Sequence, residues 1–158
     1  MNKIFPKETL KELLDGLREA GKTIVFTNGC FDILHVGHVR YLREAKKLGD
    51  ILVLALNSDA SVRAIKGEKR PLVPEDERAD IMAALESIDY VILFDDTTPQ
   101  GLIEYLKPDI LVKGGDWTEA AIAGADFVKA SGGRVITIPL TEGRSTTNIV
   151  EKIRQVYS

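Results

Sequence analysis

The segment from Asn28 to His38, N-G-C-F-D-I-L-H-V-G-H, contains both histidines of the chain and its only cysteine. His35 and His38 are three positions apart, with Gly37 between them, where an apolar run gives way to a helical pattern. Imidazoles at such a junction can hold a metal ion, form hydrogen bonds with the polar groups of a turn, or donate hydrogen bonds to a phosphate. The choice among these uses depends on which other residues the fold brings to the same place.

Five short, almost continuously apolar runs alternate with helical patterns along the chain. The runs cover residues 23–28, 51–57, 90–94, 109–113 and 134–140. Such runs are typical of strands buried on both faces of a parallel sheet. The sequence therefore predicts one Rossmann-like α/β domain over residues 1–158, a doubly wound sheet of five parallel strands with helices on both faces.

The helical segments have recognisable starts and apolar faces. A helix from about Lys7 to Glu19 is expected within an N-terminal extension over residues 1–20. Another begins at Pro74 and would turn Ile81 and Leu85 inward. A last helix is predicted from the apolar stripe of Ile149, Val150, Ile153 and Val156.

Polar and glycine-rich segments follow four of the five predicted strands. They are residues 28–38, 57–59, 113–117 and 141–147. In an open α/β sheet the ligand crevice lies at the carboxyl ends of the strands, where the strand order reverses. The pattern predicts a site for a small, anionic ligand, because helix N-termini and glycine amides face this edge.

The three uses of the histidines can now be compared. A zinc site would need Cys30 or Asp32 as further ligands, because zinc takes about three or four protein ligands. Two histidines at this spacing could also be satisfied polar residues of a turn. Phosphate binding is favoured because Gly37 permits close approach of a ligand and the following helix begins with free N–H groups.

The composition is that of an ordinary globular chain. It has 158 residues, of which 44% are hydrophobic and 28% charged, and its net charge is −3. This charge gives no general attraction to nucleic acid, so no nucleic-acid partner is expected. One cysteine cannot form an internal disulfide, and neither a signal-peptide core nor a membrane-length apolar run is seen. We therefore expect a cytoplasmic protein without a membrane partner.

Several motifs resemble those of a known family. H-V-G-H at 35–38 resembles the HxGH signature of the nucleotidyltransferase α/β-phosphodiesterase superfamily, and E-G-R-S-T-T at 142–147 resembles its second signature. Arg144 stands where an apolar or aromatic residue is commoner. G-G-D-W at 114–117 is similar to an element of cytidylyltransferases. With K-G-E-K-R-P at 66–71 and G-A-D-F-V-K-A-S-G-G at 124–133, the chain most resembles superfamily members that adenylylate D-glycero-D-manno-heptose 1-phosphate.

The resemblance implies a reaction and its substrates. An adenylyl group would pass from ATP to the heptose 1-phosphate, giving ADP-heptose and pyrophosphate for lipopolysaccharide core or another heptose glycan. The sugar-phosphate oxygen would attack the α-phosphorus in line, with Mg²⁺ held mainly by the phosphates and by no protein side chain. The family is also compatible with a homo-oligomer.

The resemblance further implies roles for individual residues. Those expected to act in catalysis are His35, His38, Lys66, Arg78, Ser145 and Thr146. Those expected to contact the nucleotide are Asn28, Gly29, Cys30, Phe31, Gly37, Lys69, Arg70, Gly114, Asp116, Trp117, Gly143 and Thr147. Those expected to contact the sugar are Asp32, Asn57, Asp59 and Glu142.

Some of these residues also fit a purely structural role. The basic loop at 66–71 could be a solvated charged segment. Arg78 could form a surface pair with Glu75, Trp117 could serve packing, and Asp59 could be the N-cap of the next helix.

Two other functions stay open. The motifs bind phosphate and do not select a base, so a cytidylyltransferase acting on glycerol 3-phosphate or another phosphorylated alcohol would share them. A non-catalytic nucleotide-binding module is the alternative of a different class. The intact H-V-G-H and S-T-T segments argue against it, since a sensor does not need groups that stabilise departing pyrophosphate.

Overall fold

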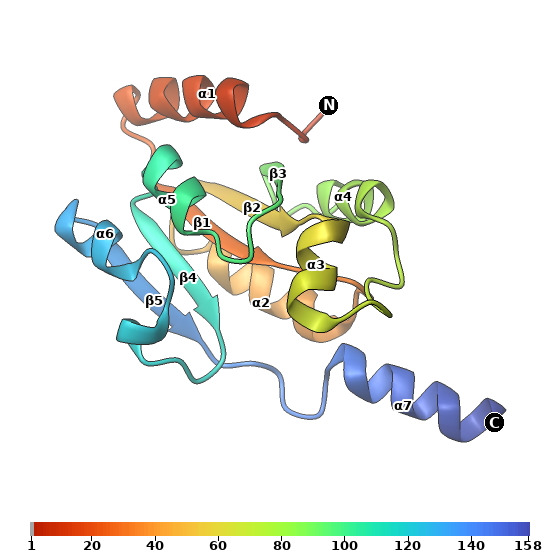
Figure 1. Ribbon diagram of the computed structural model, residues 1–158. Helices are drawn as coiled ribbons and strands as arrows, with labels where there is room; N and C mark the ends of the chain where they lie inside the picture. The colour runs from red at the N-terminus through yellow and green to blue at the C-terminus, as the bar shows by residue number, and fades with distance from the viewer. Residues whose placement is uncertain (1) are drawn as a thin grey trace.

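The apolar runs form one parallel sheet in the computed structural model, which describes residues 2–158 (Figure 1). The strands are β1 (Ile24–Gly29), β2 (Ile51–Asn57), β3 (Tyr90–Phe94), β4 (Ile110–Gly114) and β5 (Arg134–Ile138). Their order is β3-β2-β1-β4-β5, and every neighbouring pair is parallel. The predicted five-stranded, doubly wound sheet is confirmed, with strand ends shifted by one or two residues.

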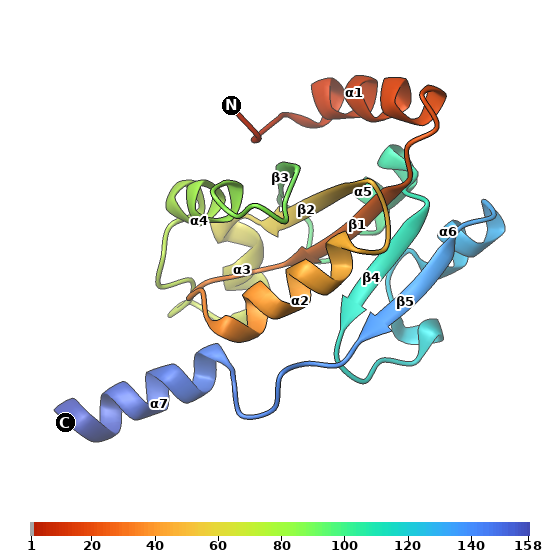
Figure 2. The same cartoon turned by 180° about the vertical axis from the view of Figure 1, so that it is seen from behind.

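Helices cover both faces of this sheet (Figures 1 and 2). They are α1 (Lys7–Glu19), α2 (Val36–Lys46), α3 (Asp59–Lys66), α4 (Glu75–Ala83), α5 (Gln100–Leu106), α6 (Ala125–Ala130) and α7 (Thr146–Tyr157), with a 3₁₀ turn, η1, at Glu119–Ala121. The bounds of α1 are those expected from the sequence. Among the helices of residues 2–158, none combines the length and the apolar content that a bilayer crossing requires.

Two hydrophobic cores form because successive side chains of a strand point to opposite faces. Phe26 of β1 packs in the core that also contains Leu14 of α1 and Ile103 of α5. Its neighbour Val25 packs in the other core, together with Leu42 of α2 and residues of α4. In a strand that is buried on both faces, every side chain lies in a core. Apolar residues are therefore favoured at successive positions, which explains the continuous apolar runs.

The winding of the chain reverses between β1 and β4. The connection from β1 to β2 runs through α2 on one face, whereas the connection from β3 to β4 runs through α5 on the other. These two connections leave β1 with a neighbour on each side, β2 and β4. The carboxyl ends of β1 and β4 therefore mark the switch point at which open α/β sheets bind ligands.

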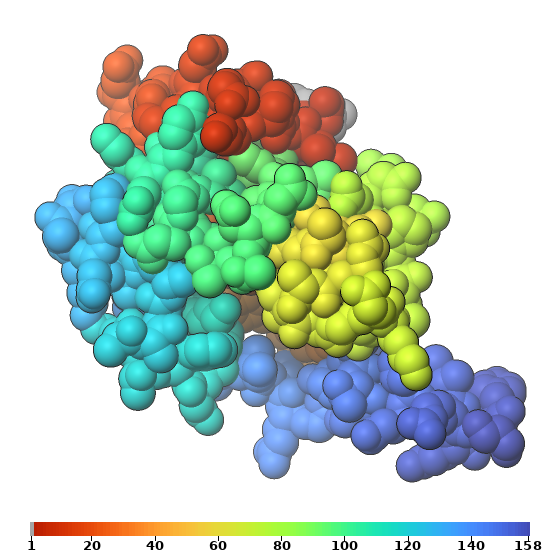
Figure 3. Space-filling view, in the orientation of Figure 1, coloured from red at the N-terminus to blue at the C-terminus, as the bar shows by residue number. Residues whose placement is uncertain are grey.

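The expectation that Ile81 points inward was wrong, whereas Leu85 packs against a core as expected. Ile81 is 40% exposed, because α4 turns Arg78, Ala79 and Met82 inward instead. The apolar stripe of α7 does not join either core, and no residue of this helix is buried. The helix projects from the body of the molecule in both the ribbon and the space-filling views (Figures 2 and 3). Periodicity correctly predicted that α7 is a helix, but it does not tell what the helix contacts.

We expect Leu14→Ala and Ile153→Ala to differ sharply in stability. Leu14 is fully buried, so its truncation leaves a cavity and should cost about 2–5 kcal/mol of unfolding free energy. Ile153 is 50% exposed, so its truncation should change the unfolding free energy by less than about 0.5 kcal/mol. Urea unfolding of both variants measures the difference. A large loss in Ile153→Ala would show that α7 packs against the body in solution.

Candidate active site

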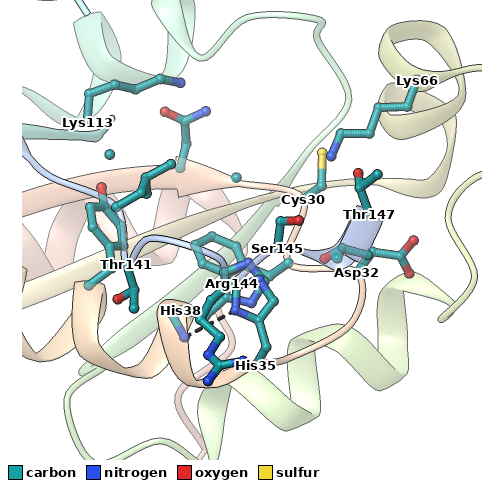
Figure 4. A pocket seen from close by; sticks show the side chains of 18 residues that line it. Cys30, Asp32, His35, His38, Lys66, Lys113, Thr141, Arg144, Ser145 and Thr147 are labelled. Carbon is teal, nitrogen blue, oxygen red and sulfur yellow. Dashed lines mark hydrogen bonds between the residues drawn. The ribbon is translucent and has the colours of Figure 1, made fainter. Parts of the chain in front are cut away.

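A cavity of about 330 Å³ opens at the carboxyl ends of β1 and β4 (Figure 4). Its volume is in the range of small-molecule sites. Its lining comes from the β1–α2 turn and α2, the end of α3, the end of β4 and the segment that leads into α7. The lining residues are Asn28, Gly29, Cys30, Phe31, Asp32, His35, Gly37, His38, Tyr41, Lys66, Lys113, Gly114, Leu140, Thr141, Arg144, Ser145, Thr146 and Thr147.

The structure brings together thirteen of the residues that the sequence singled out, but nine lie outside the lining. Those nine are Asn57, Asp59, Lys69, Arg70, Arg78, Asp116, Trp117, Glu142 and Gly143. Five lining residues had been given no individual role: Lys113, Thr141 and Arg144, which lie in segments predicted at the ligand edge, and Tyr41 and Leu140, which lie outside those segments.

The two histidines form a stacked pair at the start of α2. His35 is the N-cap, and its Nδ1 accepts a hydrogen bond from the Gly37 N–H at 3.1 Å. A neutral imidazole that accepts at Nδ1 has its proton on Nε2, so His35 keeps a donor for a ligand. The rings of His35 and His38 stack with centroids 3.7 Å apart, and Phe31 meets His38 edge-on at 4.9 Å. A side chain at Gly37 would collide with the His35 ring, which gives this glycine a packing role.

Both imidazoles are held in the neutral form. Burial lowers the pKa of His38 to about 4, and the nearby charges of His35 and Lys66 act in the same direction. Burial also lowers the pKa of His35. The buried Nδ1 of His38 has no hydrogen-bond partner in the described part of the chain. At neutral pH the pair therefore offers N–H donors and not imidazolium charges.

A metal site at the histidines finds no support in residues 2–158. No three histidine, cysteine, aspartate or glutamate side chains within that range lie close enough to hold an ion.

Asp32 was expected to contact a sugar, but its oxygens are already occupied. The carboxylate accepts hydrogen bonds from Arg70 Nε at 2.6 Å and from the N–H groups of Leu72 and Val73 at 2.9 and 2.8 Å. Burial acts to raise the pKa of Asp32, but these hydrogen bonds and the Arg70 charge outweigh it, so the pKa is lowered. Asp32 thus anchors the loop between α3 and α4 and stays ionised.

Arg78 was expected to act in catalysis or to form a surface pair with Glu75, and the structure shows no such surface pair in residues 2–158. Its side chain is buried, and its guanidinium donates to the carbonyl oxygens of Val73, Cys30 and Asn57 at 2.9, 2.7 and 2.8 Å. A fourth hydrogen bond, at 2.8 Å, joins it to the carboxylate of Asp59. Arg78 therefore ties together the ends of β1 and β2 and the start of α3, outside the pocket.

The side chains of Asn57 and Asp59, which were expected to contact a sugar, have partners within the protein. Ser58, and not Asp59, is the N-cap of α3, because its Oγ accepts from the Ser61 N–H. The Asn57 side chain donates to Ser61 Oγ at 2.9 Å and is buried. Both predicted sugar ligands are thus engaged in holding the β2–α3 turn.

The basic loop and the segment after β4 are only partly in the site. Lys66 lines the pocket, whereas Lys69 is exposed outside it and Arg70 is directed to Asp32. Trp117 is 47% exposed and lies under the ammonium group of Lys113, 5.0 Å from its ring centroid. The remaining predicted residues outside the lining, Asp116, Glu142 and Gly143, are also exposed.

The start of α7 supplies a second helix N-terminus. Ser145 is its N-cap and accepts from the Asn148 N–H at 3.1 Å, and the Thr146 hydroxyl lies 3.5 Å from the Ile33 carbonyl. The backbone N–H groups of Thr146 and Thr147 have no acceptor within residues 2–158. Free amides and the positive end of a helix dipole favour an anion here.

The charges of the lining also favour an anion. Lys66, Lys113 and Arg144 line the cavity, and none of them forms an ion pair within residues 2–158. The single lining carboxylate, that of Asp32, is neutralised by Arg70. The site therefore combines unpaired cations, neutral imidazole donors and two helix N-termini.

Comparisons with known proteins show what the chain is similar to. The family model described as cytidylyltransferase-like matches residues 26–152. The chain is 59% identical over 156 residues to the bifunctional protein HldE of Syntrophotalea carbinolica, and 57% identical over 157 residues to that of Trichlorobacter lovleyi. Each alignment covers 99% of this chain and 32% of the relative, so the chain spans about a third of the length of these relatives.

A solved structure has the same fold. It is the crystal structure of the lipopolysaccharide core biosynthesis protein from Thermoplasma volcanium GSS1, which superposes with a TM-score of 0.64 at 31% sequence identity. The match covers 78% of this chain and 100% of the other.

We expect Arg78→Met to destabilise the protein strongly. The substitution leaves three carbonyl oxygens and the Asp59 carboxylate without their donor, and breaking such a buried pair costs about 3–5 kcal/mol. The melting temperature should fall by about 6–20 °C. Arg63→Met, at an exposed position of α3, is the matched control, and this variant should melt within a few degrees of the unsubstituted protein. Equal melting of the two variants would contradict the role assigned to Arg78.

We also expect acid to destabilise the protein through His38. The pKa in the folded state is about 4, below the ordinary value of 6.5, so the unfolded chain binds more protons between these values. The unfolding free energy should therefore fall as pH drops from about 6.5 to 4, and His38 should make no contribution above that window. Urea unfolding at several pH values should show a smaller fall for His38→Asn. Identical pH profiles would show that the imidazole is not desolvated in the folded state.

Proposed function

Because the chain belongs to the cytidylyltransferase-like family, we propose that it transfers an adenylyl group from ATP to D-glycero-D-manno-heptose 1-phosphate, releasing pyrophosphate. The observation that supports this most is the stacked His35–His38 pair at the start of α2, inside a cavity with unpaired cations. An ADP-heptose product fits the match of almost the whole chain to part of the HldE proteins, and it fits the fold shared with a lipopolysaccharide core biosynthesis protein. Residues 1–158 would act as a single nucleotidyltransferase domain, since both cores share one sheet.

The reaction would need no protein nucleophile. An oxygen of the sugar phosphate attacks the α-phosphorus of ATP, the bond to the β-phosphate oxygen breaks, and pyrophosphate departs with the electron pair. The N–H groups of the histidine pair and of the first turn of α7 donate to oxygens whose negative charge grows as pyrophosphate leaves. Neutral imidazoles suit this role because they donate hydrogen bonds without needing a counter-ion before the substrates bind.

Magnesium would be bound mainly by the substrates. The only carboxylate of the lining, that of Asp32, is engaged by Arg70, Leu72 and Val73, so the described pocket offers no free acidic ligand. Mg²⁺ in phosphoryl-transfer sites commonly binds through substrate phosphates and water. When bound, it would neutralise phosphate charge.

The other expectations about cellular context stay with this proposal. The substrates are small molecules, no nucleic-acid partner is needed, and ATP and sugar phosphates suit a reaction in the cytoplasm. A homo-oligomer is compatible with it.

Pyrophosphate release tests the proposal directly. The protein should release pyrophosphate with ATP and D-glycero-D-manno-heptose 1-phosphate, and at a much lower rate with CTP or with glycerol 3-phosphate. Faster release with CTP and glycerol 3-phosphate would favour the cytidylyltransferase alternative. Nucleotide binding without release for any acceptor would favour a non-catalytic module.

We expect His38→Ala to reduce kcat by about 10²–10³-fold, because a donor to the developing charge is lost. The variant should remain folded at pH 7.5, where His38 makes no titration-linked contribution to stability. Steady-state kinetics and far-UV circular dichroism measure the two effects. A folded variant with kcat close to that of the unsubstituted enzyme would refute the role of His38.

A further inference from the structure

Lys113 is a half-buried cation without a partner. It lies near the end of β4 and lines the pocket, and within residues 2–158 its ammonium group forms neither an ion pair nor a hydrogen bond. Its one assigned contact is with the face of the Trp117 ring, at 5.0 Å. Burial lowers the pKa of Lys113, against the opposing influence of Cys30. A cation placed out of water in this way is costly unless an anion binds beside it.

Lys113 and the histidine pair approach the pocket from opposite sides of the sheet. Val112 packs in the core that contains Leu42 of α2, and side chains alternate along a strand, so Lys113 points to the face away from α2. The histidines stand at the start of α2 itself. Figure 4 shows the same separation, with Lys113 on one side of the β1 ribbon and His35 and His38 on the other.

This separation matches the demands of in-line displacement. The attacking and leaving oxygens must lie on opposite sides of the α-phosphorus. Under the proposed function, pyrophosphate leaves toward the histidines and the N-terminus of α7. The acceptor oxygen must then approach from the side on which Lys113 stands.

We infer that Lys113 binds the phosphate group of the acceptor sugar and positions its oxygen for attack on ATP. This role rests on the proposed function. No acidic group of the lining neutralises Lys113, because the only carboxylate there, that of Asp32, forms an ion pair with Arg70. Lys113 thus selects a phosphorylated acceptor over a neutral one.

Kinetics with two neutral variants test this role. Lys113→Met and Lys113→Gln should raise KM for heptose 1-phosphate at least about tenfold, while KM for ATP changes less than about twofold. Lys22→Met, on an exposed lysine away from the pocket, is the control and should alter neither constant. An unchanged KM for the sugar phosphate, or equal increases for both substrates, would overturn the inference.

Fluorescence of Trp117, the only tryptophan of the chain, gives a test that does not depend on turnover. An anion that draws Lys113 away from the indole should change the emission. Heptose 1-phosphate, and more weakly inorganic phosphate, should give a saturable change in the unsubstituted protein and in Lys22→Met, but not in Lys113→Met. The dephosphorylated heptose should give none.

The two measurements separate the possible failures. If the unsubstituted protein releases no pyrophosphate with any acceptor, the proposed function fails, and a phosphate-dependent change that is lost in Lys113→Met still assigns anion binding to Lys113. If the unsubstituted protein shows no phosphate-dependent change at all, the inference about Lys113 fails even when adenylyl transfer is observed.

Discussion

The site depends on the buried guanidinium of Arg78. This group could not stay charged and buried without acceptors, and it finds them at the carboxyl end of β1, at the end of β2 and in the loop before α4. Its hydrogen bond to Cys30 fixes the backbone just before the turn that leads to the histidines. One side chain outside the cavity therefore sets the positions of segments that are far apart in the sequence.

The ion pairs around the pocket explain its positive character. Asp59 is paired with Arg78 and Asp32 with Arg70, so these two acidic groups are neutralised by arginines that hold the structure together. Lys66, Lys113 and Arg144 of the lining have no such ion-pair partners in residues 2–158. Because the structural pairs are fixed before any ligand arrives, little reorganisation is needed when phosphates bind. The same residues that hold the loops thus prepare the electrostatics of the cavity.

Sequence patterns predicted the five-stranded sheet because strands that are buried on both faces appear in the sequence as continuous apolar runs. They also predicted that the β1–α2 turn and the start of α7 meet, since the carboxyl ends of parallel strands share one edge. They could not assign Arg78, whose acceptors are mostly backbone carbonyl oxygens and have no signature of their own. Lys113 lies in a segment predicted at the ligand edge but was given no role of its own, because a lysine at the end of a strand also resembles an ordinary polar terminator. The N-cap of α3 was misplaced by one residue because Ser58 and Asp59 are both good caps.

The sequence of α7 favours a helix, although this helix packs against neither hydrophobic core. A helix of 12 residues is marginal in isolation, and α7 buries none of its side chains. Three contacts hold its first turn. They are the Ser145 cap, the weak contact of the Thr146 hydroxyl with the Ile33 carbonyl, and the hydrogen bond from the Asn148 side-chain amide to the Gly143 carbonyl. These contacts lie at the edge of the cavity, next to the free N–H groups that favour a phosphate. Under the proposed function, a bound triphosphate would therefore stabilise the start of α7, and by linkage any contact that stabilises this turn would tighten nucleotide binding.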